Sequence, residues 1–235
     1  MNREYHRWDS PSLGRAMELL VFGHAGTPVL VFPSSCGRFF EFEDRGMVAT
    51  IADRIEGGEV QLFCVDSVDE ESWYNRNVGP RWRIARHLQY ERYCIDEVLP
   101  LMRQSNRSEN RIALGCSFGG YHAVNIALRH PAEFHGFLSM SGAFDTTGFL
   151  SGYHDDDVYF NQPVQYIQNA HGRQLEQYRR GTYILACADW DICRGYNERM
   201  AGIFASRDVP YRLDIWGEQA KHDWPIWHRM LKAYF

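Results

Sequence analysis

The sequence predicts an α/β fold, in which helices cover both faces of a mostly parallel β-sheet. Short apolar runs typical of buried strands alternate with segments of helical periodicity along most of the 235 residues, a pattern that favours a parallel sheet. The composition, 45% hydrophobic and 23% charged, is that of a soluble globular protein. No linker, repeat or low-complexity stretch divides the chain, so we expect a single domain over residues 1–235.

The elements are expected in the following order. Residues 16–22 and 29–32 are joined by a turn-rich link, which predicts an antiparallel hairpin at one edge of the sheet. The other strands are expected at residues 60–65, 112–114, 137–140, 183–186 and 211–215. The helices are expected at residues 39–55, 84–102, 118–129, 192–206 and 224–234.

Residues 145–180 interrupt this alternation with an acidic triplet, several Tyr and Gln residues, and one weak helical pattern over 164–167. A solvated surface excursion would have the same composition. We favour an insertion that walls the active-site cleft at the carboxyl ends of the strands.

Charge and cysteine usage narrow the classes of function. The formal charge of −5 and the lack of any Lys/Arg run exclude a nucleic-acid partner. The N-terminus has no apolar segment typical of a signal peptide, and no stretch approaches the roughly 18 apolar residues of a membrane span. The six scattered cysteines form no zinc-binding pattern. We therefore expect a cytoplasmic location with reduced thiols, no membrane partner, and neither a metal nor a cofactor.

The most informative segment is Gly115-Cys116-Ser117-Phe118-Gly119, which lies between a predicted strand and a predicted helix. A G-x-S-x-G match in this context predicts a nucleophile elbow, a sharp turn that exposes the Ser117 hydroxyl. The flanking positions must be small so that strand and helix can approach each other. The backbone N–H of Phe118 would then form part of an oxyanion hole at the positive end of the helix.

A serine nucleophile needs a histidine base, and the histidine needs a carboxylate. His222 lies in the loop after the last predicted strand, where this chain order places the base. The preceding strand is followed by two acids, and we favour Asp191 over Asp189 as the partner of His222. Asp223 more simply caps the C-terminal helix.

The second oxyanion donor is expected in the loop that follows residues 29–32, because small residues there let backbone N–H groups face the oxyanion. We favour Ser35, with Ser34 and Cys36 as alternatives. Three aromatic residues are candidates for lining the substrate pocket, although a core or surface position explains any single one of them more simply: Trp73, Tyr74 and Tyr153.

Four segments of the chain resemble the putative esterase family of the α/β-hydrolases, which includes esterase D-type enzymes, feruloyl esterase domains and the antigen 85 mycolyltransferases. They are residues 28–35, 115–120, 185–191 and 222–227. The resemblance implies an α/β-hydrolase fold and a serine esterase with Ser117 as nucleophile, His222 as base and Asp191 as acid. The chain departs from many relatives in its oxyanion loop, which has Pro-Ser-Ser where they carry His-Gly or Asp-Gly.

These observations predict a serine hydrolase that cleaves a small-molecule carboxylic ester through an acyl-enzyme. The alternatives are acyl transfer or thioester hydrolysis by the same triad, and a non-catalytic binding protein that retains the elbow for packing. The residues leave open the acyl and alcohol groups of the substrate, and also whether the chain forms a homo-oligomer.

Overall fold

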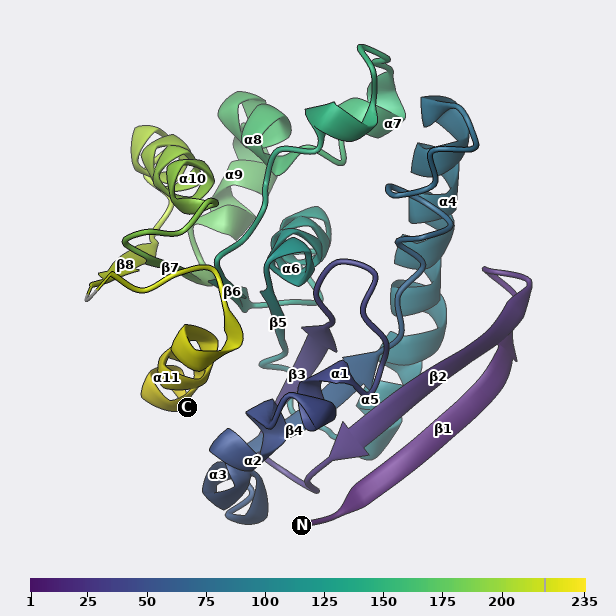
Figure 1. Ribbon diagram of the computed structural model, residues 1–235, viewed down its shortest axis with the longest axis vertical. Helices are drawn as coiled ribbons and strands as arrows, with labels where there is room; N and C mark the ends of the chain where they lie inside the picture. The colour runs from purple at the N-terminus through teal and green to yellow at the C-terminus, as the bar shows by residue number, and fades with distance from the viewer. Residues whose placement is uncertain (218) are drawn as a thin grey trace.

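A mixed β-sheet forms the centre of the computed structural model, which describes residues 1–217 and 219–235 (Figure 1). Within these residues the sheet has eight strands in the order β1-β2-β4-β3-β5-β6-β7-β8. The strands are β1 Arg3–Ser10, β2 Arg15–Phe22, β3 Thr27–Phe32, β4 Val60–Val65, β5 Ile112–Cys116, β6 Gly136–Met140, β7 Thr182–Ala188 and β8 Arg212–Trp216. Strands β3 to β8 run parallel, whereas β1 and β2 form an antiparallel edge. The predicted fold class is confirmed.

The predicted hairpin between residues 16–22 and 29–32 is wrong. Strand β4 lies between β2 and β3, antiparallel to β2 and parallel to β3. The link between β2 and β3 instead reaches across the start of β4, where the Thr27 N–H donates to the Glu59 carbonyl (2.9 Å). The hairpin partner of β2 is β1, which the sequence analysis missed because this edge strand is largely exposed and mostly polar.

The central strands are buried because helices cover both faces of the sheet. Side chains alternate between the two sides, as the twofold period of a strand requires. In β3, Leu30 and Phe32 join the core under the helices from α4 to α6, whereas Val29 and Val31 join the core under α1–α3 and α11. The apolar runs in the sequence therefore correspond to strands buried on both faces.

The helices are α1 Glu41–Asp44, α2 Met47–Thr50, α3 Ala52–Glu56, α4 Pro80–Arg92, α5 Leu99–Ser105, α6 Phe118–Arg129, α7 Asp156–Tyr159, α8 Pro163–Tyr166, α9 Gly172–Tyr178, α10 Arg194–Ser206 and α11 Trp224–Tyr234. A π-helical turn, Tyr93–Val98, joins α4 to α5, just before Pro100, which has no backbone N–H to donate. Short 3₁₀ turns span Thr147–Phe149 and Ile167–Asn169.

The single helix predicted over residues 39–55 is wrong, since this segment forms three short helices. The first break is at Gly46, whose φ of 74° is left-handed, and the second is at Ile51, with φ −122° and ψ 26°. The apolar side chains that gave the helical pattern still face the sheet. Periodicity therefore identified the buried face but not the interruptions.

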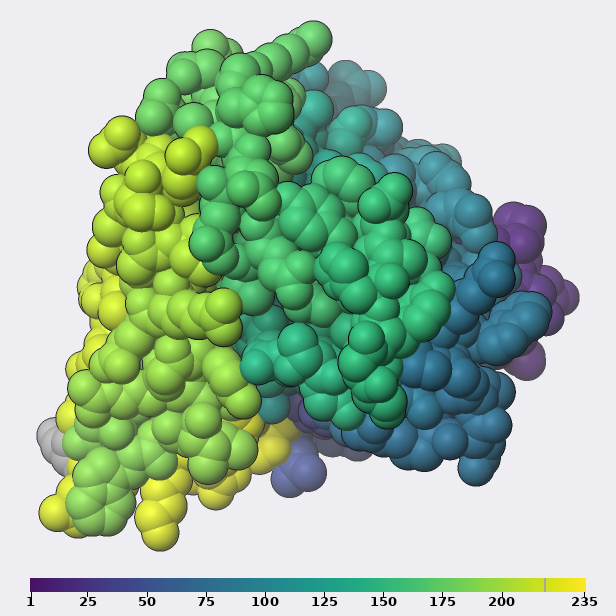
Figure 2. Space-filling model, turned by 90° about the horizontal axis from the view of Figure 1, so that it is seen from above, coloured from purple at the N-terminus to yellow at the C-terminus, as the bar shows by residue number. Residues whose placement is uncertain are grey.

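The segment between β6 and β7 is packed rather than loosely solvated. Val158, Ile167 and Tyr178 are fully buried and belong to the core that also contains α4 and α6. Seen from above, this segment (green) covers a large part of the surface (Figure 2). Among the described residues, no helix is long and apolar enough to cross a bilayer.

Candidate active site

Ser117 lies at a strained turn between β5 and α6. Its φ of 56° and ψ of −121° are unfavourable for a residue with a side chain. The turn is possible because Gly115 and Gly119 have no Cβ. A Cβ on Gly115 would lie 2.2 Å from the carbonyl carbon of Gly119, and a Cβ on Gly119 would lie 2.4 Å from the Pro33 carbonyl oxygen. The strand, helix and oxyanion loop therefore meet at the serine, which is partly exposed.

The structure brings Ser117, His222 and Asp191 into one hydrogen-bonded chain. The Ser117 Oγ lies 2.9 Å from His222 Nε2, and Asp191 Oδ1 lies 2.8 Å from His222 Nδ1. Because an ionised carboxylate only accepts, Nδ1 carries the proton and Nε2 is free to accept from the serine hydroxyl. This is the tautomer that a general base next to a nucleophilic serine requires.

Asp191 is placed for this role by the first turn beyond β7. Its side chain is fully buried, and Oδ1 also accepts from the Cys193 N–H (2.7 Å). Burial by itself raises the pKa of Asp191, but His222, the Ser141 hydroxyl and the Cys193 N–H together stabilise the charged form more strongly, so the pKa lies below its ordinary value. The carboxylate is therefore charged at neutral pH.

Asp189 occupies a different position. Its Oδ2 accepts from the Gln219 N–H (3.2 Å), and its backbone carbonyl accepts from Arg194. Asp223 caps α11, as predicted, by accepting from the Trp224 N–H (2.7 Å). Of these three acids, only Asp191 is hydrogen-bonded to His222 in the described part of the chain.

Trp227 packs next to His222. It belongs to the segment 222–227 that resembles the esterase family, but the sequence analysis assigned Trp227 no role. Its ring packs edge-on against the His222 ring, with centroids 5.0 Å apart. Its Nε1–H donates to the Ser141 hydroxyl (2.9 Å), which fixes the indole. His222 lies two residues before α11 and Trp227 lies in its first turn, so the chain entering the helix brings the two side chains together.

The oxyanion loop, residues 33–37, lies beside the nucleophile elbow. The N–H groups of Ser34 and Cys36 are both used, since they donate to Glu41 (2.7 Å) and Asp69 (3.1 Å). Among the described residues, the Ser35 N–H has no hydrogen-bond acceptor. Of the three candidate donors in this loop, Ser35 alone retains a free backbone N–H.

The three pocket candidates differ in their surroundings. Trp73 is fully buried against His87 and Tyr121, so the expectation that it lines a pocket is wrong. Trp73 was a candidate because it follows the end of a strand, a position that buried residues and pocket-lining residues share. Tyr74 is partly exposed and donates its hydroxyl to Ser35 Oγ (2.8 Å). Tyr153 instead donates to Asp155 (2.5 Å).

An aromatic wall beside the elbow includes a residue that the sequence analysis missed. The Phe149 ring lies 4.8 Å from the Tyr74 ring and 5.5 Å from the Phe118 ring, measured between centroids. Phe149 belongs to the segment between β6 and β7, whose aromatic residues carried no distinguishing pattern. The contact joins that segment to the residue that follows Ser117.

Donor atoms of Asp191, Cys193 and His222 lie within 4.8 Å of one another, a spacing that a metal ion would accept. The chemistry of the donors argues against such a use. His222 already uses both ring nitrogens in hydrogen bonds, Nδ1 to Asp191 and Nε2 to Ser117, so a metal ion would have to displace one of them.

We expect Gly119→Ala to impair both stability and activity, because the added methyl must displace the Pro33 backbone. The cost of overpacking is about 1–3 kcal/mol, and displacement of the oxyanion loop should lower kcat/KM at least about 10-fold. Thermal unfolding and ester hydrolysis measure the two effects.

Gly148→Ala is the matched control, since a Cβ there meets nothing within 4 Å. An alanine at position 119 that behaves like one at position 148 would contradict the proposed closeness of the elbow and the oxyanion loop.

Comparison with known proteins supports the assignment of the fold and the family. A family model described as "Putative esterase" matches residues 29–234. A search of curated proteins by sequence finds no match. Solved structures similar to this chain include a ferulic acid esterase, with 18% identity, a TM-score of 0.80, and coverage of 99% of this chain and 95% of that one.

Two further structures extend this likeness. S-formylglutathione hydrolase from Staphylococcus aureus is 16% identical with a TM-score of 0.73, and the match covers 99% of this chain and 95% of that one. MPT51 from Mycobacterium tuberculosis is 16% identical with a TM-score of 0.74, and the match covers 99% and 96%. At these identities the likeness establishes the α/β-hydrolase fold. Together with the family match over nearly the whole chain, it shows that this protein belongs to the putative esterase family of carboxylic ester hydrolases.

Proposed function

We propose that this carboxylic ester hydrolase is a serine esterase that uses Ser117, His222 and Asp191 as its catalytic triad. The observation that carries the proposal is the continuous hydrogen-bonded chain from the Ser117 hydroxyl through His222 to the buried Asp191 carboxylate. It starts at a strained serine on a nucleophile elbow, the position from which a hydroxyl can reach a substrate carbonyl.

In the first half-reaction, Ser117 Oγ attacks the ester carbonyl carbon and its proton passes to His222 Nε2. The carbonyl electron pair moves to oxygen, which gives a tetrahedral oxyanion. When the intermediate collapses, the bond to the alcohol oxygen breaks, and His222 returns the proton to the leaving alcohol. In the second half-reaction, water takes the place of the alcohol, and the acid leaves with Ser117 restored.

The oxyanion is held by the N–H groups of Phe118 and Ser35. Phe118 is the first residue of α6, where the helix dipole favours negative charge. The Ser35 N–H has no other acceptor among the described residues, so it is available to a developing oxyanion. Each such donor contributes about 3 kcal/mol to stabilising the transition state.

The aromatic wall of Tyr74 and Phe149 suggests where the acyl group of a small-molecule ester lies. Tyr74 contacts Ser35 and Phe149 contacts Phe118, so both border the two proposed oxyanion donors. We also propose that the segment between β6 and β7 walls the cleft through Phe149, and that Tyr153 lies further out. The six free thiols, five of them buried, fit the cytoplasmic location that we propose.

A fluorophosphonate probe tests the proposed function. Ser117 Oγ displaces fluoride from phosphorus, so the wild type should be labelled covalently and stoichiometrically, with the adduct on the tryptic peptide that contains Ser117. Ser117→Ala should not be labelled. Failure of the folded wild type to react, or a label on another residue, would contradict the proposal. Ester hydrolysis should be lost in parallel with labelling, which separates an enzyme from a binding protein that retains the elbow for packing.

A further inference from the structure

Two carboxylates hold the oxyanion loop from opposite ends. Glu41 accepts from both the N–H and the hydroxyl of Ser34 (2.7 Å each). Asp69 accepts from the Cys36 N–H through Oδ2 (3.1 Å). Cys36 itself has a left-handed φ of 57°, so the backbone turns sharply just beyond Ser35. Ser35 therefore lies between two residues whose backbone N–H groups are hydrogen-bonded to carboxylates.

Asp69 in turn is held by the helix that carries the nucleophile. Its side chain is fully buried, and its Oδ1 accepts from His122 Nε2 (2.9 Å). His122 lies on α6, five residues after Ser117, and its ring is stacked on Phe32 at the end of β3. A single carboxylate thus connects the nucleophile helix to the backbone next to the second oxyanion donor.

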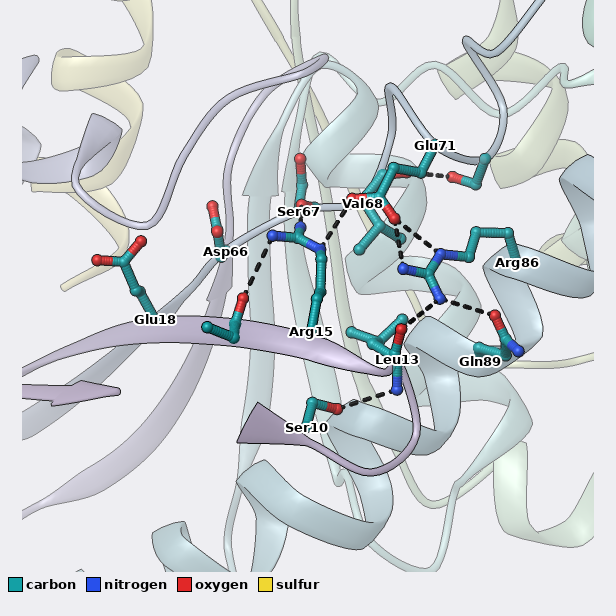
Figure 3. Close-up of polar contacts among 12 residues, drawn as sticks. Ser10, Leu13, Arg15, Glu18, Asp66, Ser67, Val68, Glu71, Arg86 and Gln89 are labelled. Atoms are coloured by element: carbon teal, nitrogen blue, oxygen red, sulfur yellow. Dashed lines mark hydrogen bonds and ion pairs between the residues drawn. The ribbon is translucent and has the colours of Figure 1, made fainter. Parts of the chain in front are cut away.

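The loop that carries Asp69, residues 66–75, is anchored at its other side. Glu71 forms ion pairs with Arg15 on β2 (2.8 Å) and with Arg86 on α4 (Figure 3). Arg86 also donates to the Leu13 carbonyl (2.8 Å), and Arg15 donates to the Ser67 carbonyl (3.0 Å). These contacts fix residues 66–75 to the antiparallel edge of the sheet, so Asp69 is presented from a rigid support.

The same loop makes a second contact with the oxyanion loop. The Tyr74 N–H donates to the Asp69 carbonyl (2.9 Å), which closes a turn, and the Tyr74 hydroxyl donates to Ser35 Oγ (2.8 Å). Ser35 is thus oriented through its side chain by Tyr74 and through the next peptide by Asp69. Burial of a carboxylate is costly unless each oxygen is hydrogen-bonded, and here both oxygens are used.

We propose that Asp69 and His122 are positioning residues that set the direction of the Ser35 N–H relative to the Ser117 hydroxyl. This inference rests on the proposed serine mechanism, because it assigns these residues a role through the oxyanion that the mechanism forms. Neither side chain touches the reacting atoms. Their effect is geometric, since oxyanion stabilisation depends on donors held at hydrogen-bonding distance before the charge develops.

The test compares Asp69→Ala with Asp69→Asn. Alanine releases the Cys36 N–H and should lower kcat/KM for p-nitrophenyl acetate about 10- to 100-fold. Asparagine retains an oxygen that can accept from Cys36 and should stay within about 3-fold of the wild type. His122→Leu, which removes the donor to Asp69 and keeps an apolar side chain, is the second variant should Asp69→Ala not fold. We expect it to lower kcat/KM about 3- to 10-fold.

Binding of a transition-state analogue is a measurement that would not change if Asp69 and His122 only stabilised the fold. Ser117 adds to the carbonyl of an aryl trifluoromethyl ketone, its proton passes to His222, and the resulting oxyanion occupies the same donors. The inhibition constant of the ketone should rise by the same factor by which kcat/KM falls across the variants. The free ketone's affinity before addition, and KM, should change little.

Glu91→Gln is the matched control. Glu91 is also a buried carboxylate paired with a histidine, His130 (2.6 Å), but it makes no hydrogen bond to residues 33–37. It should lower the melting temperature and leave kcat/KM and the ketone inhibition constant unchanged. Equal catalytic losses in Glu91→Gln and Asp69→Ala would overturn the inference.

Two other outcomes are decisive. In the first, the wild type hydrolyses esters and binds the ketone, and a folded Asp69→Ala has the same kcat/KM and the same ketone inhibition constant. This result overturns the positioning role of Asp69 but leaves the serine mechanism intact. A folded wild type that forms no ketone adduct overturns the serine mechanism, and the positioning role is overturned with it.

Discussion

Replacing Ser117 with alanine is expected to lower kcat for ester hydrolysis by about 10⁶-fold, the loss found when a triad nucleophile is removed. No other hydroxyl among the described residues is hydrogen-bonded to His222, so no side chain can replace the nucleophile. Steady-state hydrolysis of p-nitrophenyl esters by the purified variant measures the loss. A variant that retains more than about one hundredth of the wild-type kcat would contradict the assignment.

The stability of position 117 provides the control for this prediction. In Ser117→Ala the residue at position 117 keeps the strained φ of 56°, so the melting temperature should hardly change. Ser117→Gly should be equally inactive but about 1 kcal/mol more stable, because glycine relieves the backbone strain and loses some of that gain to its greater unfolded-state entropy. In a chain of this length, that difference is about 3 °C in the melting temperature.

Replacing Asp191 with alanine is expected to lower kcat about 10⁴-fold. The substitution removes the oxygen that accepts from His222 Nδ1, so the imidazole loses the partner that fixes its tautomer and orientation. It also loses the negative charge that stabilises the imidazolium formed when Nε2 takes the proton of Ser117. The measurement is kcat across a series of p-nitrophenyl esters, with the fold checked by thermal unfolding.

Asp189→Asn is the control for the choice between the two acids. Its amide oxygen can still accept from the Gln219 N–H, and the side chain makes no hydrogen bond to His222 among the described residues. We expect kcat within about 3-fold of the wild type. A larger loss in Asp189→Asn than in Asp191→Ala would exchange the two roles.

Much of the architecture follows from local patterns. The parallel strands were predictable because apolar runs of three to six residues stand between amphipathic helices and turn residues. The exposed edge strand β1 and the breaks within residues 41–56 were not, because a polar edge strand has no distinctive pattern and a short kink does not change the helical period. The strand order near β2 also depends on β4, which lies between β2 and β3 but follows both in the chain.

The candidate site divides in a similar way. Ser117 and His222 could be proposed as partners because the elbow is a local strand-turn-helix motif and the histidine follows the last strand, and the structure places their side chains in hydrogen-bond contact. The choice between Asp189 and Asp191 rested on loop spacing and resemblance, and the structure places only Asp191 against His222. Trp73 and Tyr74 are adjacent in sequence with the same residue character, yet one side chain is fully buried and the other contacts Ser35.

By itself, the sequence determined the class of fold and the family and indicated the proposed nucleophile, because each depends on the order of residues within short segments. The tertiary structure alone decided which backbone N–H remains available beside that nucleophile. That outcome depends on Glu41 and Asp69, which satisfy the neighbouring N–H groups from other elements. Hydrogen bonds between segments far apart in the chain are set by how the sheet brings their ends together, and no local pattern encodes them.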